Sequence, residues 1–213
     1  MDEEVTIIDS KTRNEKIKNF FISNMKNLII GFSFIFILVI GYLSMKEMKE
    51  REKIKLAKQF NITTINFKIE GKQRTIDQLT RMINQNDATY SPLALYFLID
   101  NNLIDNKDEI NNLFDQLIKE TSLDEEIKNL IIYKKALFNS EFSTENDLLQ
   151  ILNPIINSES IWKSHSLYLL AEYFYSKNQK QKAKEFFEQI LLLPNANNDI
   201  KVESKKRINR DIG

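Results

Sequence analysis

An uninterrupted apolar stretch near the N-terminus runs from Asn27 to Met45 and contains no charged side chain. Lys26 and Lys46 stand directly on either side of it. As an α-helix, its 19 residues would be about 28 Å long, close to the ~30 Å thickness of the hydrocarbon core of a bilayer. The pattern predicts one membrane-spanning helix over residues 27–45.

Two other classes of segment fit this stretch less well. A cleavable signal peptide has a shorter apolar core followed by small residues at its cleavage site, whereas Leu43, Ser44 and Met45 lead directly into charged residues. A buried helix of a globular core usually carries a polar edge. We therefore interpret residues 27–45 as a retained anchor.

The segments on either side of the predicted span are rich in charge. Residues 1–26 form an N-terminal tail that is acidic at its start and then basic and amphipathic, which suits either a helix at the membrane surface or a loosely ordered tail. Residues 46–56 alternate in charge, with Glu47 and Arg51 one helical turn apart, and predict a solvated helical stalk. Five Lys and Arg residues closely precede the span and six closely follow it, so the positive-inside rule does not decide the orientation.

From residue 57 onward, apolar residues recur at intervals of three and four, which predicts short amphipathic helices joined by polar turns. Residues 62–71 are ambiguous, because apolar side chains also alternate there as in a strand. No later segment supplies a partner strand, so a helix is the favoured interpretation. Further helices are predicted over residues 75–84, 161–177 and 200–210, the last as a solvated basic cap.

Several residues mark where these helices should begin and end. Ser91, which precedes a proline, is typical of an N-cap, and Asp105 precedes the next apolar stripe. Pro154 is expected to kink or end its helix. The sequence Ser122-x-x-Glu125 matches a capping box. The apolar residues that follow this box, and that we expect on one buried face, are Ile127, Leu130, Ile131 and Leu137.

The segment from Ser164 to Asn197 carries the clearest internal pattern. Its large, small and aromatic residues stand where a tetratricopeptide repeat places the side chains that pack the two helices of a hairpin together. Weaker units are recognisable over residues 57–90, from Tyr90 onward and around Ala136. The predicted fold class is all-α, with one N-terminal transmembrane helix followed by a tetratricopeptide-like helical-hairpin solenoid over residues 57–213. The residues that carry the pattern are Leu167, Leu170, Ala171, Phe174, Ala183, Phe187 and Ile190.

The composition supports a helical protein and excludes several kinds of site. The chain has 4 glycines and 3 prolines among 213 residues, fewer than the turns of a sheet protein require. Its 30 Lys and Arg residues balance 30 Asp and Glu residues, so the net charge does not favour a nucleic-acid partner. The absence of cysteine excludes disulfides, thiolate metal sites and a cysteine nucleophile.

The sequence contains no recognisable catalytic or metal-binding motif. His165 is the only histidine, so a histidine-based metal cluster is excluded. Gly71 and Lys72 lack the upstream glycine and the following Ser or Thr of a phosphate-binding loop. The carboxylates of Asp124 and Glu125 suit the N-terminus of a helix better than acid–base work. We therefore predict that the chain is not an enzyme and binds no cofactor or metal ion.

The overall layout, with a tail, a single span and a helical domain that includes the pattern of residues 164–197, resembles a known family. This family comprises bacterial inner-membrane proteins described as ancillary subunits of the Sec translocon. The resemblance implies a single-pass inner-membrane protein whose residues from about 46 onward lie in the periplasm. It also implies an adaptor that assists translocation or chaperone hand-off, with the translocon, periplasmic chaperones and membrane lipid as partners. The even charges around the span depart from a clear positive-inside pattern, so this topology depends on the resemblance.

Protein binding is the activity that the sequence favours. In a tetratricopeptide hairpin the first helix lines the concave groove, which in this register makes His165, Tyr168, Glu172 and Tyr175 the candidate partner-binding residues. Tyrosines beside a carboxylate suit an extended peptide or a partner helix. The same side chains would also suit packing between repeats, and the sequence leaves this open. A second hypothesis is a structural scaffold whose helices self-associate into a homo-oligomer or organise a cell-envelope complex.

Overall fold

The computed structural model describes residues 2–212, and it describes the side chains of residues 15–211 apart from 28 and 70. The surface character predicted for residues 1–14 therefore lies outside the described side chains. Helices and turns make up the described part and it contains no strand, which confirms the all-α prediction. The chain divides into two compact units, Met1–Lys55 and Leu56–Gly213.

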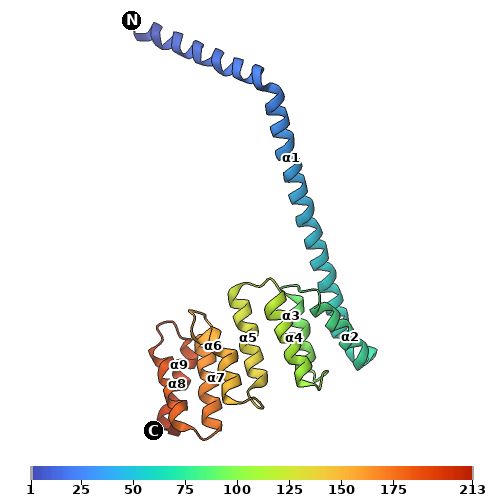
Figure 1. Ribbon diagram of the computed structural model, residues 1–213, viewed down its shortest axis with the longest axis vertical. Helices are drawn as coiled ribbons and strands as arrows, with labels where there is room; N and C mark the ends of the chain where they lie inside the picture. Colours follow the sequence, from blue (N-terminus) through green and yellow to red (C-terminus); the bar gives the residue numbers. More distant parts are fainter. Residues whose placement is uncertain (1, 213) are drawn as a thin grey trace. The chain divides into compact units, whose positions relative to one another are not determined.

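The first helix, α1, is unbroken from Asp2 to Glu70 (Figure 1). It includes the predicted span, the predicted stalk and residues 62–70, which are helical as predicted. Its most apolar part is long and apolar enough to cross a membrane, with a mean hydropathy of 2.1, and none of that part is buried. Among the described residues it is the one helix with this property. Gly71 ends α1 with a φ of 89°, a left-handed conformation that glycine adopts without steric cost.

Short helices follow α1 in the second unit (Figure 1). They are α2 (Lys72–Ile83), α3 (Tyr90–Asp100), α4 (Lys107–Glu120), α5 (Glu125–Asn139), α6 (Glu145–Ile156), α7 (Lys163–Ser176), α8 (Lys180–Leu192) and α9 (Asn198–Arg207), with a π-helical turn at Ile208–Ile212. From α2 onward each helix packs against the next, and α7 also contacts α5 and α9. The starts of α2, α4, α6 and α8 lie 35, 38 and 35 residues apart, and the starts of α3, α5, α7 and α9 have the same separations.

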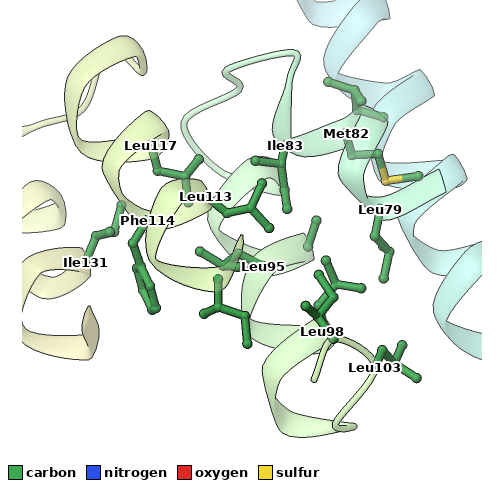
Figure 2. Close-up of a cluster of buried hydrophobic side chains, with 14 residues drawn as sticks. Leu79, Met82, Ile83, Leu95, Leu98, Leu103, Leu113, Phe114, Leu117 and Ile131 are labelled. Atoms are coloured by element: carbon green, nitrogen blue, oxygen red, sulfur yellow. The ribbon is translucent and has the colours of Figure 1, made fainter. Parts of the chain in front are cut away.

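Two hydrophobic cores lie inside the second unit. Figure 2 shows Leu79, Leu95 and Leu113, from three successive helices, pointing into the first core. The second core is filled by aromatic and aliphatic side chains of α5 to α8. α5 takes part in both, because Ile131 lies in the first core and the next residue, Ile132, lies in the second. This helix therefore joins the two halves of the unit.

The start of α3 differs from the prediction. The helix begins at Tyr90, and the Asp87 carboxylate accepts hydrogen bonds from the backbone N–H groups of Thr89 (2.9 Å) and Tyr90 (2.7 Å). Ser91 is therefore not the N-cap. Its hydroxyl donates instead to the Met82 carbonyl (2.8 Å), which fastens α3 to the end of α2. Thr89 stands at the N-cap position, and the Asp87 carboxylate two residues before it is the side chain that accepts from the N–H groups at the start of α3.

The capping box predicted at Ser122 is wrong, because α5 begins at Glu125 and no side chain caps it. Ser122 stands before the N-cap position, which Asp124 occupies, and so outside the reach of the first-turn N–H groups. A capping box forms instead at the start of α6. There the Thr144 hydroxyl accepts from the Asp147 N–H (3.3 Å), and the Asp147 carboxylate accepts from the Thr144 N–H (3.3 Å).

Three further helix ends refine the prediction. Pro154 does not end α6, which continues for two more residues. Asn106, rather than Asp105, caps α4, and its side chain accepts from two backbone N–H groups of the first turn. The last helix, α9, is packed rather than solvated, since Ser204 is buried and Ile200 packs against the second core. Burial of the sides of α7 and α8 requires such a cover at the end of the unit.

We expect Thr144→Ala to lower the free energy of unfolding by about 1 kcal/mol, because it removes the hydroxyl that caps α6. Ser122→Ala is the matched control and should change this free energy by less than about 0.5 kcal/mol. Chemical denaturation of the full chain in detergent micelles measures both values. Equal losses from the two substitutions would contradict this assignment of the cap.

Candidate functional site

The four candidate residues predicted from the sequence all lie on α7, and none of them is exposed. His165, Tyr168, Glu172 and Tyr175 are each half-buried. The reason is that α7 is enclosed by four helices, α5, α6, α8 and α9. These four side chains are therefore partly covered by neighbouring helices, and their binding to a partner stays a prediction.

Glu172 and Tyr175 both contact α9 through the side chain of Arg207. Nε of Arg207 donates to the Glu172 carboxylate (2.7 Å), and a second guanidinium nitrogen donates to its other oxygen. The same guanidinium lies 4.4 Å from the centroid of the Tyr175 ring and also pairs with Asp211. Hydrogen bonding to Glu172 raises the pKa of Arg207 further above its ordinary value. This end of the predicted site is occupied by the chain itself.

Tyr168 lies in the same environment as Glu172, whose carboxylate acts on its hydroxyl. Burial, and then the negative charge of Glu172, raises the pKa of Tyr168 to about 12, so its hydroxyl is neutral over the physiological range. Its ring meets Phe187 of α8 edge to face, with the ring centroids 5.5 Å apart. These contacts are those of a residue that packs between helices.

His165 lies in a different environment, in an aromatic cluster with Tyr133 and Trp162. The rings of Tyr133 and Trp162 are stacked with centroids 5.8 Å apart, and His165 lies 5.1 Å from Trp162 and 6.0 Å from Tyr133. Burial lowers the pKa of His165, because the charged imidazolium loses its hydration there. The structure thus divides the four predicted residues into two separate packing groups.

A more open apolar site lies between α3 and α5. It is a slot of about 180 Å³, with the buried ring of Phe114 from α4 beneath it. Burial raises the pKa of Tyr96, on its α3 side, to about 12. Leu137, on its α5 side, is 43% exposed. The residues that line the α3–α5 slot are Tyr96, Ile99, Asp100, Phe114, Lys134, Leu137 and Phe138.

Aromatic rings and lysines continue outward from this slot. The ring centroid of Phe138 lies 5.4 Å from that of Phe142, and the Lys107 Nζ lies 3.7 Å from the Phe142 centroid. The Lys134 Nζ lies 5.5 Å from the centroid of Tyr96. Cations in these positions leave their charge available at the rim of an apolar surface. The arrangement suits an apolar side chain in the slot with a carboxylate beside it.

A larger cleft of about 450 Å³ next to α5 and α6 offers less to a ligand. Its central polar groups bind one another: the Asn111 and Asn139 amides exchange two hydrogen bonds (3.0 and 2.7 Å), and the Lys135 Nζ lies 2.8 Å from Asp115. Polar groups that already have partners gain little from a ligand that must displace them. The α3–α5 slot is therefore the better candidate binding site.

The slot is not evident from the sequence, because its residues come from three helices, α3, α4 and α5, that meet only in the folded chain. Leu137 was assigned to the buried face of its helix, and so was Ile127, but both are exposed. A signal was present in α5, where apolar residues at positions 130–133 and 136–138 surround more than one face. A helix with apolar residues on so much of its surface has to be covered by more neighbours than an amphipathic one.

Within the part of the chain that the structure describes, no three His, Asp or Glu side chains lie close enough together to hold a metal ion. No protein-family model matches the chain, and neither a curated protein nor a solved structure matches it. The candidate site is therefore argued from its own geometry.

Arg207→Ala should loosen α9, because the guanidinium holds Glu172, Asp211 and the face of Tyr175 together. We expect a loss of about 1–2 kcal/mol in the free energy of unfolding, as is typical of hydrogen bonds to charged groups that remain partly solvated. Backbone amides of α9 should also exchange hydrogen faster in the variant. Lys206→Ala, at an exposed position on the same helix, is the control; equal exchange in the two variants would refute this role of Arg207.

The folded state should lose stability as the pH falls below about 6.5, the ordinary pKa of histidine. Because the pKa of His165 is lower in the folded chain, the unfolded chain binds a proton first, and stability is retained only above this pH. Denaturation of the full chain in micelles, at pH values from about 7.5 to about 5.5 on either side of that ordinary pKa, measures the slope of the free energy of unfolding against pH. His165→Gln should flatten the slope, since the chain has no other histidine; an unchanged slope would exclude His165 as its origin.

Proposed function

We propose that this protein is a membrane-anchored, non-enzymatic adaptor that binds protein partners through the α3–α5 slot. The observation that carries the proposal is the exposed apolar segment of α1, which has no charged residue over positions 27–45. A large exposed apolar surface on a soluble chain marks a site that something else covers. For a segment of this length and composition, the hydrocarbon core of a bilayer is the natural cover.

The anchoring step follows from the free energy of apolar surface. Side chains such as Phe32, Ile37 and Leu43 stand outward from α1 with no neighbour from the described chain covering them. Each would cost about 1.5–3 kcal/mol to leave in water relative to burial. An α-helix satisfies its own backbone hydrogen bonds, so α1 can enter lipid without unpaired polar groups.

The binding step follows from the size and lining of the slot. A cavity of ~150 Å³ lined by apolar side chains accepts a benzene molecule, so a slot of about 180 Å³ has room for one aromatic or aliphatic side chain. Lys134 and Lys107 would favour an acidic residue next to that side chain. A peptide or helix of a partner protein presents this combination readily.

The finer form of the proposal places the second unit in the bacterial periplasm, near the Sec translocon and periplasmic chaperones. Support for it comes from the layout of the sequence, in which a single apolar segment precedes a unit of short helices with regular spacing. We interpret that spacing of 35 and 38 residues as a divergent tetratricopeptide-like repeat. Anchoring would raise the local concentration of a weak binding slot near membrane-bound partners.

A photo-reactive amino acid at position 137, followed by crosslinking in membranes, tests the binding step. We expect adducts with membrane or periplasmic proteins. Leu137→Asp should reduce recovery of the same proteins with the affinity-purified chain about tenfold, because the carboxylate would have to be desolvated in an apolar contact. Leu191→Asp, at a position of similar exposure on α8 (37% against 43%), should leave the recovery unchanged.

Two outcomes would contradict parts of this proposal separately. Equal losses from Leu137→Asp and Leu191→Asp would remove the slot as the binding site. Recovery of cytosolic proteins alone, together with a reporter fused after Gly213 that is active only in the cytoplasm, would reject the periplasmic form. That result would leave the anchor itself intact.

A further inference from the structure

The stretch of α1 directly before the apolar segment, residues 15–26, has an apolar face. Its members are Ile17, Phe20, Phe21 and Met25, which stand at positions i, i+3, i+4 and i+8 and so lie on one side of the helix. Each of these side chains is between 50% and 58% exposed. The rings of Phe20 and Phe21 meet edge to face, with their centroids 6.0 Å apart. The described side chains of the protein thus leave this face open.

Lysines border the apolar face on both sides. Lys16 and Lys18 are the neighbours of Ile17 in the sequence, so they lie about 100° around the helix from it in either direction. Their long stems can follow an apolar surface while the ammonium groups reach a polar one. Glu15 is the one carboxylate within positions 10–26, and the other carboxylates before the apolar segment stand at positions 2–9, farther from it. The face therefore combines apolar side chains with a positively charged border.

Two polar residues in this stretch have their side chains hydrogen-bonded within the helix. The Ser23 hydroxyl donates to the Phe20 carbonyl (3.2 Å), and the Asn24 amide donates to the same carbonyl (3.0 Å) and to the Ser23 hydroxyl (3.1 Å). Because these groups already have partners, they can approach an apolar environment at little cost. Ser23 and Asn24 therefore do not prevent the apolar face from entering a membrane surface.

The same hydrogen bonds favour a bend in α1. Side chains that bond to a carbonyl one turn earlier compete with the helix's own hydrogen bonds and often bend it. Within the first unit, α1 changes direction in its blue N-terminal part (Figure 1). A bend before position 27 allows the preceding turns to follow a membrane surface while the apolar segment crosses the bilayer.

We propose that residues 15–26 form a surface helix that binds an anionic phospholipid bilayer. Continuity identifies the partner, because Asn27, at the start of the proposed span, directly follows the segment and keeps it at the bilayer. The lysines identify the lipid charge, since each Lys next to an anionic membrane surface raises the affinity about fivefold. Helices that lie in the interface combine an apolar face with basic residues in this way. The inference rests on the proposed anchoring.

Spin labels measure the depth of each side of the helix, and the chain has no cysteine that would react elsewhere. The full chain carries a nitroxide on Phe21→Cys, in the apolar face, or on Asn19→Cys, on the opposite side. Vesicles contain phosphatidylcholine with or without phosphatidylglycerol. Oxygen concentrates in lipid and a nickel chelate stays in water, so the ratio of their collision rates with the nitroxide reports depth. We expect this ratio to be at least about threefold higher at position 21 than at position 19 in the anionic vesicles.

Removal of the charges tests the lipid preference. Lys16→Gln with Lys18→Gln, or vesicles without phosphatidylglycerol, should at least halve the difference between the two positions, because each lysine contributes about fivefold to the affinity. Lys46→Gln with Lys49→Gln removes the same charge on the other side of the proposed span and should leave the difference unchanged.

Equal ratios at positions 19 and 21 in the anionic vesicles would overturn the proposal. The vesicles contain no other protein, so a face that binds a protein partner would stay in water and give this result. A difference that neither change of charge reduces would overturn the preference for anionic lipid. Extraction of the chain from the vesicles at alkaline pH is measured in parallel. A chain that resists extraction but shows equal ratios refutes the surface helix alone, whereas an extractable chain refutes the anchoring.

Discussion

The second unit depends on one constraint, which is that its helices are too short to be stable alone. Isolated helices of fewer than about 12–15 residues are marginal in water, and α2 to α9 have 10–15 residues each. Each therefore has to bury its apolar face against the next helix in the chain. The result is a succession of contacts rather than one central core, and α5 contributes to both hydrophobic cores through the neighbouring residues Ile131 and Ile132. Loss of order in α5 would thus weaken both halves.

This constraint also decides which surfaces remain free for partners. Around α7, four neighbouring helices are present, and they use the aromatic and charged side chains that might otherwise bind a ligand. The pairing of Glu172 with Arg207 is the clearest example, because a residue near the end of the chain occupies a position that would have suited a peptide. Between α3 and α5 the cover is incomplete. The slot with Leu137 at its rim is where the succession of helices leaves apolar surface in contact with water.

The long first helix connects the two proposed roles of the protein. Its apolar segment is long enough to span a membrane, and its last turns pack against the first core through Phe60 and Phe67.

The sequence by itself determined the helical class, the apolar segment of α1 and the helical state of residues 62–70. These properties depend on residues close together in the chain, through the 3.6-residue period and the scarcity of glycine and proline. Caps were less predictable, because Asp87 and Ser91, or Ser122 and Thr144, offer similar chemistry and only the path of the turn selects between them. Tertiary structure alone decided which faces were covered. The partial cover of Glu172 depends on Arg207 of α9, and the α3–α5 slot requires helices that begin 35 residues apart, so no local pattern could reveal either one.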